Sequence, residues 1–196
     1  MARSTPSPPA QQSEAMFDEL LVIMAQTGDK RAFERLHQRW NTRLGRTALR
    51  YTGSADAARD LTQDCWLAIW KGIGQLRDTS RFRAYAFGVL HRKGADHLRR
   101  VIIARQREDD LKPAAEPSES PRQGDQSALQ QAFVALPPDQ RLAAHLHFVE
   151  GFTLSEIAEV QSIPAGTAKS RLFHARRKLK AALNDTPSTD DPEGDT

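Results

Sequence analysis

The sequence predicts an all-α protein made of two small helical domains joined by a flexible linker. Apolar residues recur with the 3.6-residue period of a helix in both halves, and no segment alternates convincingly with the period of two that strands require. A stretch rich in proline and serine separates the halves at residues 105–126. The 196 residues, 39% of them hydrophobic, suffice for one domain or two small ones.

The first helical domain is expected over residues 17–104, after an arm at 1–16 that is predicted to be disordered. Four apolar stripes at helical spacing follow one another, with breaks at Gly28-Asp29, at Gly53-Ser54 and in a polar loop at 72–81. The stripes consist of Phe17, Leu20, Leu21 and Met24; of Phe33, Leu36, Trp40 and Leu44; of Leu61, Cys65 and Ile69; and of Phe82, Tyr85, Ala86, Val89 and Leu90.

The second domain is expected over residues 127–183, followed by an acidic tail at 184–196 that is predicted to be disordered. Pro137-Pro138 and Gly151 end its first two helices, and a short turn at Gln161-Ser162-Ile163 separates its last two. Pro164 suits the first turn of the last helix, because its φ is preset and it has no N–H to lose there. A short helix, a tight turn and a second helix form a helix-turn-helix, the unit that reads DNA in many proteins.

Charge is segregated along the chain. The net charge is +3 overall, but it is +7 over residues 17–100, +3 over 127–184, −2 over 101–126 and −5 over 185–196. Two basic blocks separated by an acidic stretch indicate two modules that face a polyanion. The alternative is a charged surface that is only solvated.

The last helix of the second domain has two distinct faces. Ala168, Leu172, Ala175 and Leu179 recur at helical spacing and are expected to pack inward. The opposite face suits a major groove, because lysine can donate to guanine, serine can bind several base edges and phenylalanine can touch a thymine methyl group. The alternative is a basic helix that merely packs. The residues predicted to bind DNA here are Gly166, Thr167, Lys169, Ser170, Arg171, Phe173, His174 and Arg177.

Several classes of function are excluded. The single cysteine, Cys65, rules out an internal disulfide and a cysteine-based zinc site, and it fits a reducing, cytoplasmic compartment. The longest apolar run, at 20–25, is far too short to span a bilayer, and the N-terminus does not resemble a signal peptide. The histidines lack metal-ligand spacing and no glycine-rich phosphate loop is present. We therefore predict no enzymatic activity, cofactor, metal, small-molecule substrate or membrane insertion.

Three motifs together resemble a known family. The run at 154–179 resembles the promoter-reading end of bacterial RNA polymerase sigma factors. Asp60-Leu61-Thr62-Gln63-Asp64, followed by Trp66, resembles the helix with which that family grips the polymerase. The stretch at 82–100 resembles its promoter-melting helix. Their order, with one linker between two domains, resembles the small extracytoplasmic-function (ECF) subfamily.

The resemblance implies a function. The protein would bind core RNA polymerase, its second domain would read the −35 promoter element as duplex, and its first domain would capture a base of the −10 element and open the DNA. An anti-sigma factor would hold it inactive. The polymerase-binding residues would be Asp60, Gln63, Asp64 and Leu67. The −10 residues would be Leu76, Arg77, Asp78, Thr79, Ser80, Phe82, Tyr85, Arg92, Arg99 and Arg100.

Two other functions stay open at this point. One is a stand-alone helix-turn-helix repressor or activator, which would be dimeric and bind palindromic sites. The other is a sigma-like adaptor that binds a regulator instead of DNA. For Phe82 and Tyr85 the alternative to base capture is ordinary core packing. The linker either threads a basic channel of the polymerase or is a solvated spacer, and the tail is either solubilising or autoinhibitory.

The chain departs from the pattern of the family at four places. Tyr85 stands where tryptophan is usual, and Leu90-His91-Arg92 stands in place of an Ala-Arg-Asn run. His174 lies where arginine is common, and Ser162 lies in the turn where glycine is frequent. The first three departures fall on residues that would contact bases, so the base preference does not follow from the resemblance. We expect the fourth to be tolerated, because serine can hydrogen-bond locally in a turn.

Overall fold

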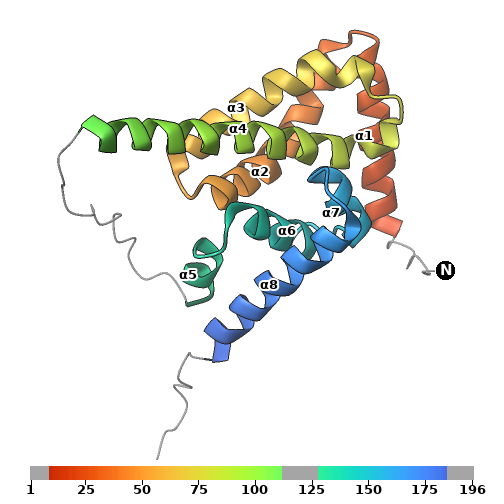
Figure 1. Cartoon of the computed structure of the whole chain (residues 1–196). Helices are drawn as coiled ribbons and strands as arrows, with labels where there is room; N and C mark the ends of the chain where they lie inside the picture. The colour runs from red at the N-terminus through yellow and green to blue at the C-terminus, as the bar shows by residue number, and fades with distance from the viewer. Residues whose placement is uncertain (1–8, 112–127, 185–196) are drawn as a thin grey trace, which may run out of the picture. The chain divides into compact units, whose positions relative to one another are not determined.

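The computed structural model describes residues 9–111 and 128–184, and every regular element in these ranges is helical (Figure 1). This confirms the predicted all-α class. The chain divides into two compact units, one formed by residues 1–102 with 159–162 and the other by 103–158 with 163–196. The greater part of the predicted linker, at 112–126, lies outside the described residues, as do 1–8 of the predicted arm and 185–196 of the predicted tail.

The first unit is built from four long helices, the last of which continues past the boundary of the unit at residue 102, and two short 3-10 turns. They are α1 (Pro9–Gln26), α2 (Lys30–Thr52), α3 (Ala55–Gly72), η1 (Ile73–Gln75), η2 (Thr79–Arg81) and α4 (Phe82–Leu111). Capping residues set the boundaries of α2. The Asp29 carboxylate accepts the N–H of Arg31 at 2.8 Å at one end, and Gly53 takes a left-handed φ of 75° at the other. Ser54 then caps α3.

Two helices are longer than the sequence predicted. α1 begins at Pro9, so residues 9–16 of the predicted arm are helical. α4 continues to Leu111, so residues 105–111 of the predicted linker are helical as well. Both extensions are rich in glutamine, glutamate, arginine or alanine, which favour a helix without supplying the apolar stripe on which the prediction rested.

The stripes predicted for α2 and α3 form the core of the first unit. Leu36, Leu44, Leu61, Cys65 and Ile69 are all fully buried or nearly so. This apolar setting raises the pKa of the Cys65 thiol to about 12. The thiol therefore stays protonated and acts as a small apolar core side chain.

The face predicted for α1 is wrong. Of the predicted stripe only Leu21 is buried, whereas Phe17, Leu20 and Met24 are exposed. Residues 20–25 are apolar without interruption, so periodicity could not select a face. Asp18 selects it: its buried carboxylate accepts hydrogen bonds from Arg39 Nε at 2.7 Å and Trp40 Nε1 at 3.0 Å.

A glycine of α4 permits a close helix approach. Gly94 is buried, and a Cβ atom added there would collide with the ring of Tyr51 at the end of α2. The Tyr51 ring is itself 2% exposed, so it has no free space into which to move. This contact fixes how closely α4 lies against α2.

The second unit contains α5 (Ala128–Val134), α6 (Pro138–Phe148), all but the last two residues of α7 (Leu154–Val160) and α8 (Ala165–Asn184). Its core includes Leu136, Ala144, Ala175 and Leu179. The buried Arg141 guanidinium donates to the carbonyl oxygens of Val134 and Leu136 and so closes the end of α5. No helix in the described ranges has the length and apolarity needed to cross a membrane.

The helix-turn-helix is formed by α7, a turn at 161–164 and α8, as the sequence predicted. Thr153 and Glu156 form a reciprocal capping box at the start of α7, with the Thr153 N–H donating to Glu156 Oε2 at 2.7 Å and the Glu156 N–H donating to Thr153 Oγ1 at 3.3 Å. In the turn, Ser162 takes a φ of 52°, the left-handed region in which glycine is unstrained.

Candidate functional site

The outer face of α8 is free within its own unit. Ala168, Ala175 and Leu179 are buried, which fixes the predicted inward side of the helix. Lys169, Ser170, Phe173, His174 and Arg177 are exposed on the other side, with Phe173 at 61%. The face is therefore apolar at its centre and basic around it, which suits contact with base edges and phosphates.

Three residues at the start of this face are in different settings. Gly166 has no neighbouring atom within 4 Å of the place where a Cβ would lie, so its backbone is open to a ligand. The Ser170 hydroxyl donates to the Gly166 carbonyl oxygen at 2.9 Å, which leaves its lone pairs as acceptors. Thr167 is only partly exposed.

Arg171 differs from the other predicted DNA contacts. Its guanidinium lies 2.8 Å from the Asp139 carboxylate at the start of α6, and its side chain is only 23% exposed. The ion pair joins two helices of the same unit. Arg171 is therefore already engaged by the fold, whereas Lys169 and Arg177 are exposed cations.

The predicted −10 surface consists of a loop and the first half of α4. Arg77, Asp78 and Ser80 are exposed in the loop, and Leu76 and Thr79 are partly exposed. Farther along α4, Arg92, Arg99 and Arg100 are exposed, and Arg99 forms a surface ion pair with Asp96 at 3.3 Å. These residues lie within one unit and offer several cations near a polar loop.

The two aromatic residues predicted for base capture have different positions. Phe82 is 2% exposed and packs edge-on against Trp40 with ring centroids 5.3 Å apart, so it belongs to the core and cannot touch DNA without a rearrangement. Tyr85 is only partly buried. Burial raises the pKa of the Tyr85 phenol, which therefore remains a protonated donor at neutral pH.

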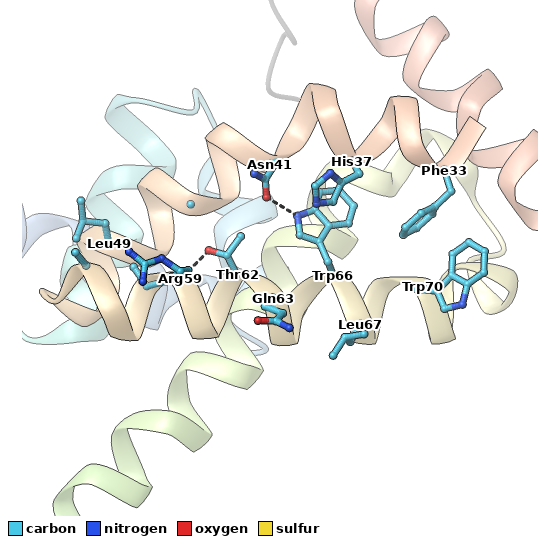
Figure 2. A pocket seen from close by; sticks show the side chains of 13 residues that line it. Phe33, His37, Asn41, Leu49, Arg59, Thr62, Gln63, Trp66, Leu67 and Trp70 are labelled. Carbon is cyan, nitrogen blue, oxygen red and sulfur yellow. Dashed lines mark hydrogen bonds between the residues drawn. The ribbon is translucent and has the colours of Figure 1, made fainter. Parts of the chain in front are cut away.

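A groove of about 590 Å³ runs between α2 and α3 (Figure 2). Its walls are mainly apolar and aromatic. The ring of Phe33 from α2 packs edge-on against that of Trp70 from α3, with the ring centroids 4.6 Å apart. Leu67 and Trp70 are 53% and 44% exposed. Such large apolar side chains in a recess of the surface are typical of a docking site for another protein.

Polar groups hold the aromatic wall of this groove in place. Trp66 donates from its indole Nε1 to Asn41 Oδ1 at 3.0 Å, as Figure 2 shows. The ring of His37 lies against Trp66 with centroids 4.6 Å apart. Burial lowers the pKa of His37, so this imidazole is neutral at physiological pH.

Of the four residues predicted to bind polymerase, Gln63 and Leu67 line the groove. Asp60 and Asp64 are exposed on the same helix and do not line it. The sequence did not predict the contribution of α2, which brings Phe33, His37 and Asn41. The helical spacing of apolar residues placed Phe33 in a stripe. It could not show that α2 and α3 leave a recess between them.

Comparison with known families gives two matches in order along the chain. Residues 36–101 match the family Sigma-70 region 2, and residues 126–179 match Sigma-70, region 4. The first match contains much of the groove, the loop and most of α4. The second contains α7, the turn and most of α8.

Similar whole proteins carry the same description. The chain is 29% identical over 183 residues to the RNA polymerase sigma-H factor of Pseudomonas aeruginosa, covering 85% of this chain and 93% of that protein. It is 26% identical over 189 residues to the ECF RNA polymerase sigma-E factor of Escherichia coli K12, covering 85% and 94%.

Two solved structures share the fold. One is the sigma factor RpoE in complex with the anti-sigma factor NepR from Bartonella quintana, with a TM-score of 0.65 over 79% of this chain and 98% of that one. The other is CnrH in complex with the cytosolic domain of CnrY, with a TM-score of 0.62 over 86% and 97%. Both are 24% identical in sequence to this chain, so they speak for the fold alone.

Proposed function

The chain belongs to the ECF subfamily of sigma-70 RNA polymerase sigma factors, and from this we propose how its surfaces divide the work of starting transcription. Members of the family are transcription initiation factors that recognise promoters and are not enzymes. In our proposal, residues 17–104 bind core polymerase and the −10 element, and residues 127–183 bind the −35 element. The observation that carries it is the presence of two unlike binding surfaces, the α2–α3 groove and the outer face of α8.

The α8 face would read the −35 element in the major groove. Lys169 is exposed and can donate to guanine O6 and N7, while the ring of Phe173 can touch a thymine methyl group. Arg176, Lys178 and Lys180 are also exposed and would contact phosphates on either side. Gly166 leaves room for a phosphate near the start of the helix.

The loop at 76–80 and Tyr85 would capture a base of the −10 element. Extruding a base from the stack requires a surface with polar groups and a flat wall, and the exposed loop residues and the half-buried phenol supply both. Arg92, Arg99 and Arg100 would contact the backbone of the opened strand. Phe82 would contribute by supporting Tyr85, whose ring centroid lies 6.5 Å from its own.

The α2–α3 groove would receive an element of core polymerase. Leu67 and Trp70 provide the apolar contact area, and Asp60, Gln63 and Asp64 provide polar and acidic groups beside it. This combination fits a partner surface that is apolar at its centre and basic at its rim. A stand-alone repressor or activator would have no use for such a surface.

A regulator would control access to these surfaces. In the solved structure of RpoE, the sigma factor is in complex with the anti-sigma factor NepR, and CnrH is in complex with a domain of CnrY. We propose that this chain too has an anti-sigma factor as a partner, and that both act in the cytoplasm, where core polymerase and DNA are found.

Run-off transcription with purified core polymerase on a pool of genomic promoter fragments tests the proposal. We expect discrete new transcripts with the wild-type protein and their loss when Lys169 and Ser170 are both changed to alanine. Lys30→Ala, which removes an exposed lysine at the start of α2, is the control and should retain the transcripts. Duplex binding without polymerase binding or transcripts would instead identify a conventional repressor or activator.

A further inference from the structure

The loop proposed to capture the −10 base is tied to α1, a helix to which the sequence assigned no function. The last residue of α1, Gln26, donates from its side-chain Nε2 to two backbone carbonyl oxygens of this region, Ile73 at 2.9 Å and Leu76 at 2.8 Å. Both partners are acceptors, so only the amide nitrogen can occupy this position. The half-buried side chain of Gln26 thus binds two residues that follow it in the sequence by 47 and 50 positions.

A second link lies one step farther along the loop. The Thr79 hydroxyl donates to Glu19 Oε1 at 2.9 Å, two helical turns before Gln26 on α1. Within the loop, the Asp78 carboxylate accepts the N–H of Ser80 at 3.2 Å. α1 therefore holds the loop at Leu76 and at Thr79, which flank the exposed side chains of Arg77 and Asp78.

The beginning of the loop is closely packed on another side. A Cβ atom at Gly72 would collide with the hydroxyl of Tyr85, so the phenol lies directly against the backbone where α3 gives way to η1. The loop is thus fixed relative to Tyr85 as well as to α1. A base captured between them would meet groups whose positions are set before DNA arrives.

We propose that α1 braces this loop and that Gln26 and Glu19 are positioning residues for base selection at the −10 element. The inference rests on the proposed function, in which the loop contacts the captured base. Discrimination between bases requires donors and acceptors held within a fraction of an ångström, and a loop with few anchors does not hold them. Loss of the brace should therefore reduce selectivity, with less effect on polymerase binding or on the fold of the unit.

The test compares promoter opening by holoenzyme on promoters that carry each of the four bases at the captured position. Opening is followed by permanganate reactivity of unpaired thymines, and the ratio of best to worst base is the readout. We expect Gln26→Ala and the nearly isosteric Gln26→Glu, which removes both donors, to lower this ratio roughly tenfold. Glu19→Ala removes only the outer link and should lower it by a smaller factor.

Two controls separate positioning from stability. Gln38→Ala removes an exposed glutamine of α2 and should leave the ratio unchanged. Leu44→Ala opens a cavity in the core beneath α2 and removes none of the bonds between α1 and the loop, so it should lower the thermal midpoint while the folded protein keeps its selectivity. Thermal unfolding of each variant, followed by circular dichroism, shows which variants are folded at the assay temperature.

The outcomes are distinct. A wild-type ratio in Gln26→Glu and Glu19→Ala would overturn the brace, as would an equal loss of selectivity in Leu44→Ala. If the wild-type protein opens all four promoters equally, the proposed −10 reading fails and the brace fails with it. Reduced selectivity in the Gln26 variants, with Gln38→Ala and Leu44→Ala unchanged, supports the brace.

Discussion

The α2–α3 groove and the outer face of α8 are opposite solutions to binding a partner. The groove is a recess walled by Phe33, Trp66 and Trp70, with the polar groups of Trp66 and Asn41 paired to each other. The α8 face is an exposed helix surface with cations around Phe173. In the proposed function, the groove would gain affinity by removing apolar area from water, and the α8 face would gain it by releasing counterions from a polyanion. The two proposed contacts should therefore respond differently to solution conditions.

The largest effect should come from a charge placed in the groove. Leu67→Arg puts a guanidinium on an apolar contact surface, and we expect the affinity for core polymerase to fall about a hundredfold, as for a central interface residue. Binding to a −35 duplex should not change. Fluorescence anisotropy with labelled core polymerase and labelled duplex measures both. Ile102→Arg alters an equally exposed apolar residue of α4 and should leave polymerase binding intact.

The next largest effect should be a difference in how salt changes the affinities of the two surfaces. If about four of the exposed cations of α8 contact phosphates, duplex affinity falls roughly a hundredfold between 50 and 200 mM salt. Polymerase binding through the groove should weaken far less. Titrations of the full chain over this range provide the test, and equal salt slopes for both partners would contradict the contrast drawn here.

A smaller effect should follow from pH. Burial lowers the pKa of His37 from its ordinary value of 6.5, so the folded state binds the proton less well than the unfolded state does. The stability that depends on neutral His37 is complete above pH 6.5 and is lost as pH falls from there towards the lowered pKa. Urea unfolding of wild type and His37→Gln between pH 5 and 7.5 should show a shallower loss in the variant. Parallel pH profiles would show that His37 plays no part.

The smallest change concerns the turn before α8. Ser162 has a left-handed φ, which costs a non-glycine residue about 1–2 kcal/mol. Glycine would remove this cost, but its greater conformational entropy would favour the unfolded chain by about 0.4–1 kcal/mol. Ser162→Gly should therefore stabilise the protein by about 0.5 kcal/mol and leave polymerase binding unchanged. Thermal melting can detect this shift, and Ser162→Val, which is strained at this φ, should move the midpoint downwards.

The sequence was most informative where apolar residues alternate with polar ones at helical spacing. Such patterns located the cores of α2, α3 and α8 and, with Pro164, the turn of the helix-turn-helix. The pattern failed in α1, where six consecutive apolar residues point in all directions and a distant pair, Arg39 and Trp40, decides which face is buried. It also failed at the ends of α1 and α4, which are helical without an apolar stripe.

The candidate site residues also divide into those that the sequence could predict and those that it could not. Exposed α8 residues could be predicted because the helix has a clear inward face. The ion pair of Arg171 with Asp139 could not, because it depends on a partner far away in sequence. For Phe82 the sequence left core packing and base capture both open, and the packing against Trp40 decides for the core. The α2 wall of the groove belongs to the same class, since a recess is a property of two helices together.

The contact of Gly94 with Tyr51 restricts how this chain can vary over generations. A larger residue at 94 is blocked by a ring that cannot move, so a mutational survey should find position 94 intolerant while Tyr51 is present. Replacing Tyr51 with a smaller side chain would remove the obstacle. The two positions are therefore epistatic, and a substitution at 94 that unfolds the protein in this background can be neutral in one that has already changed at 51.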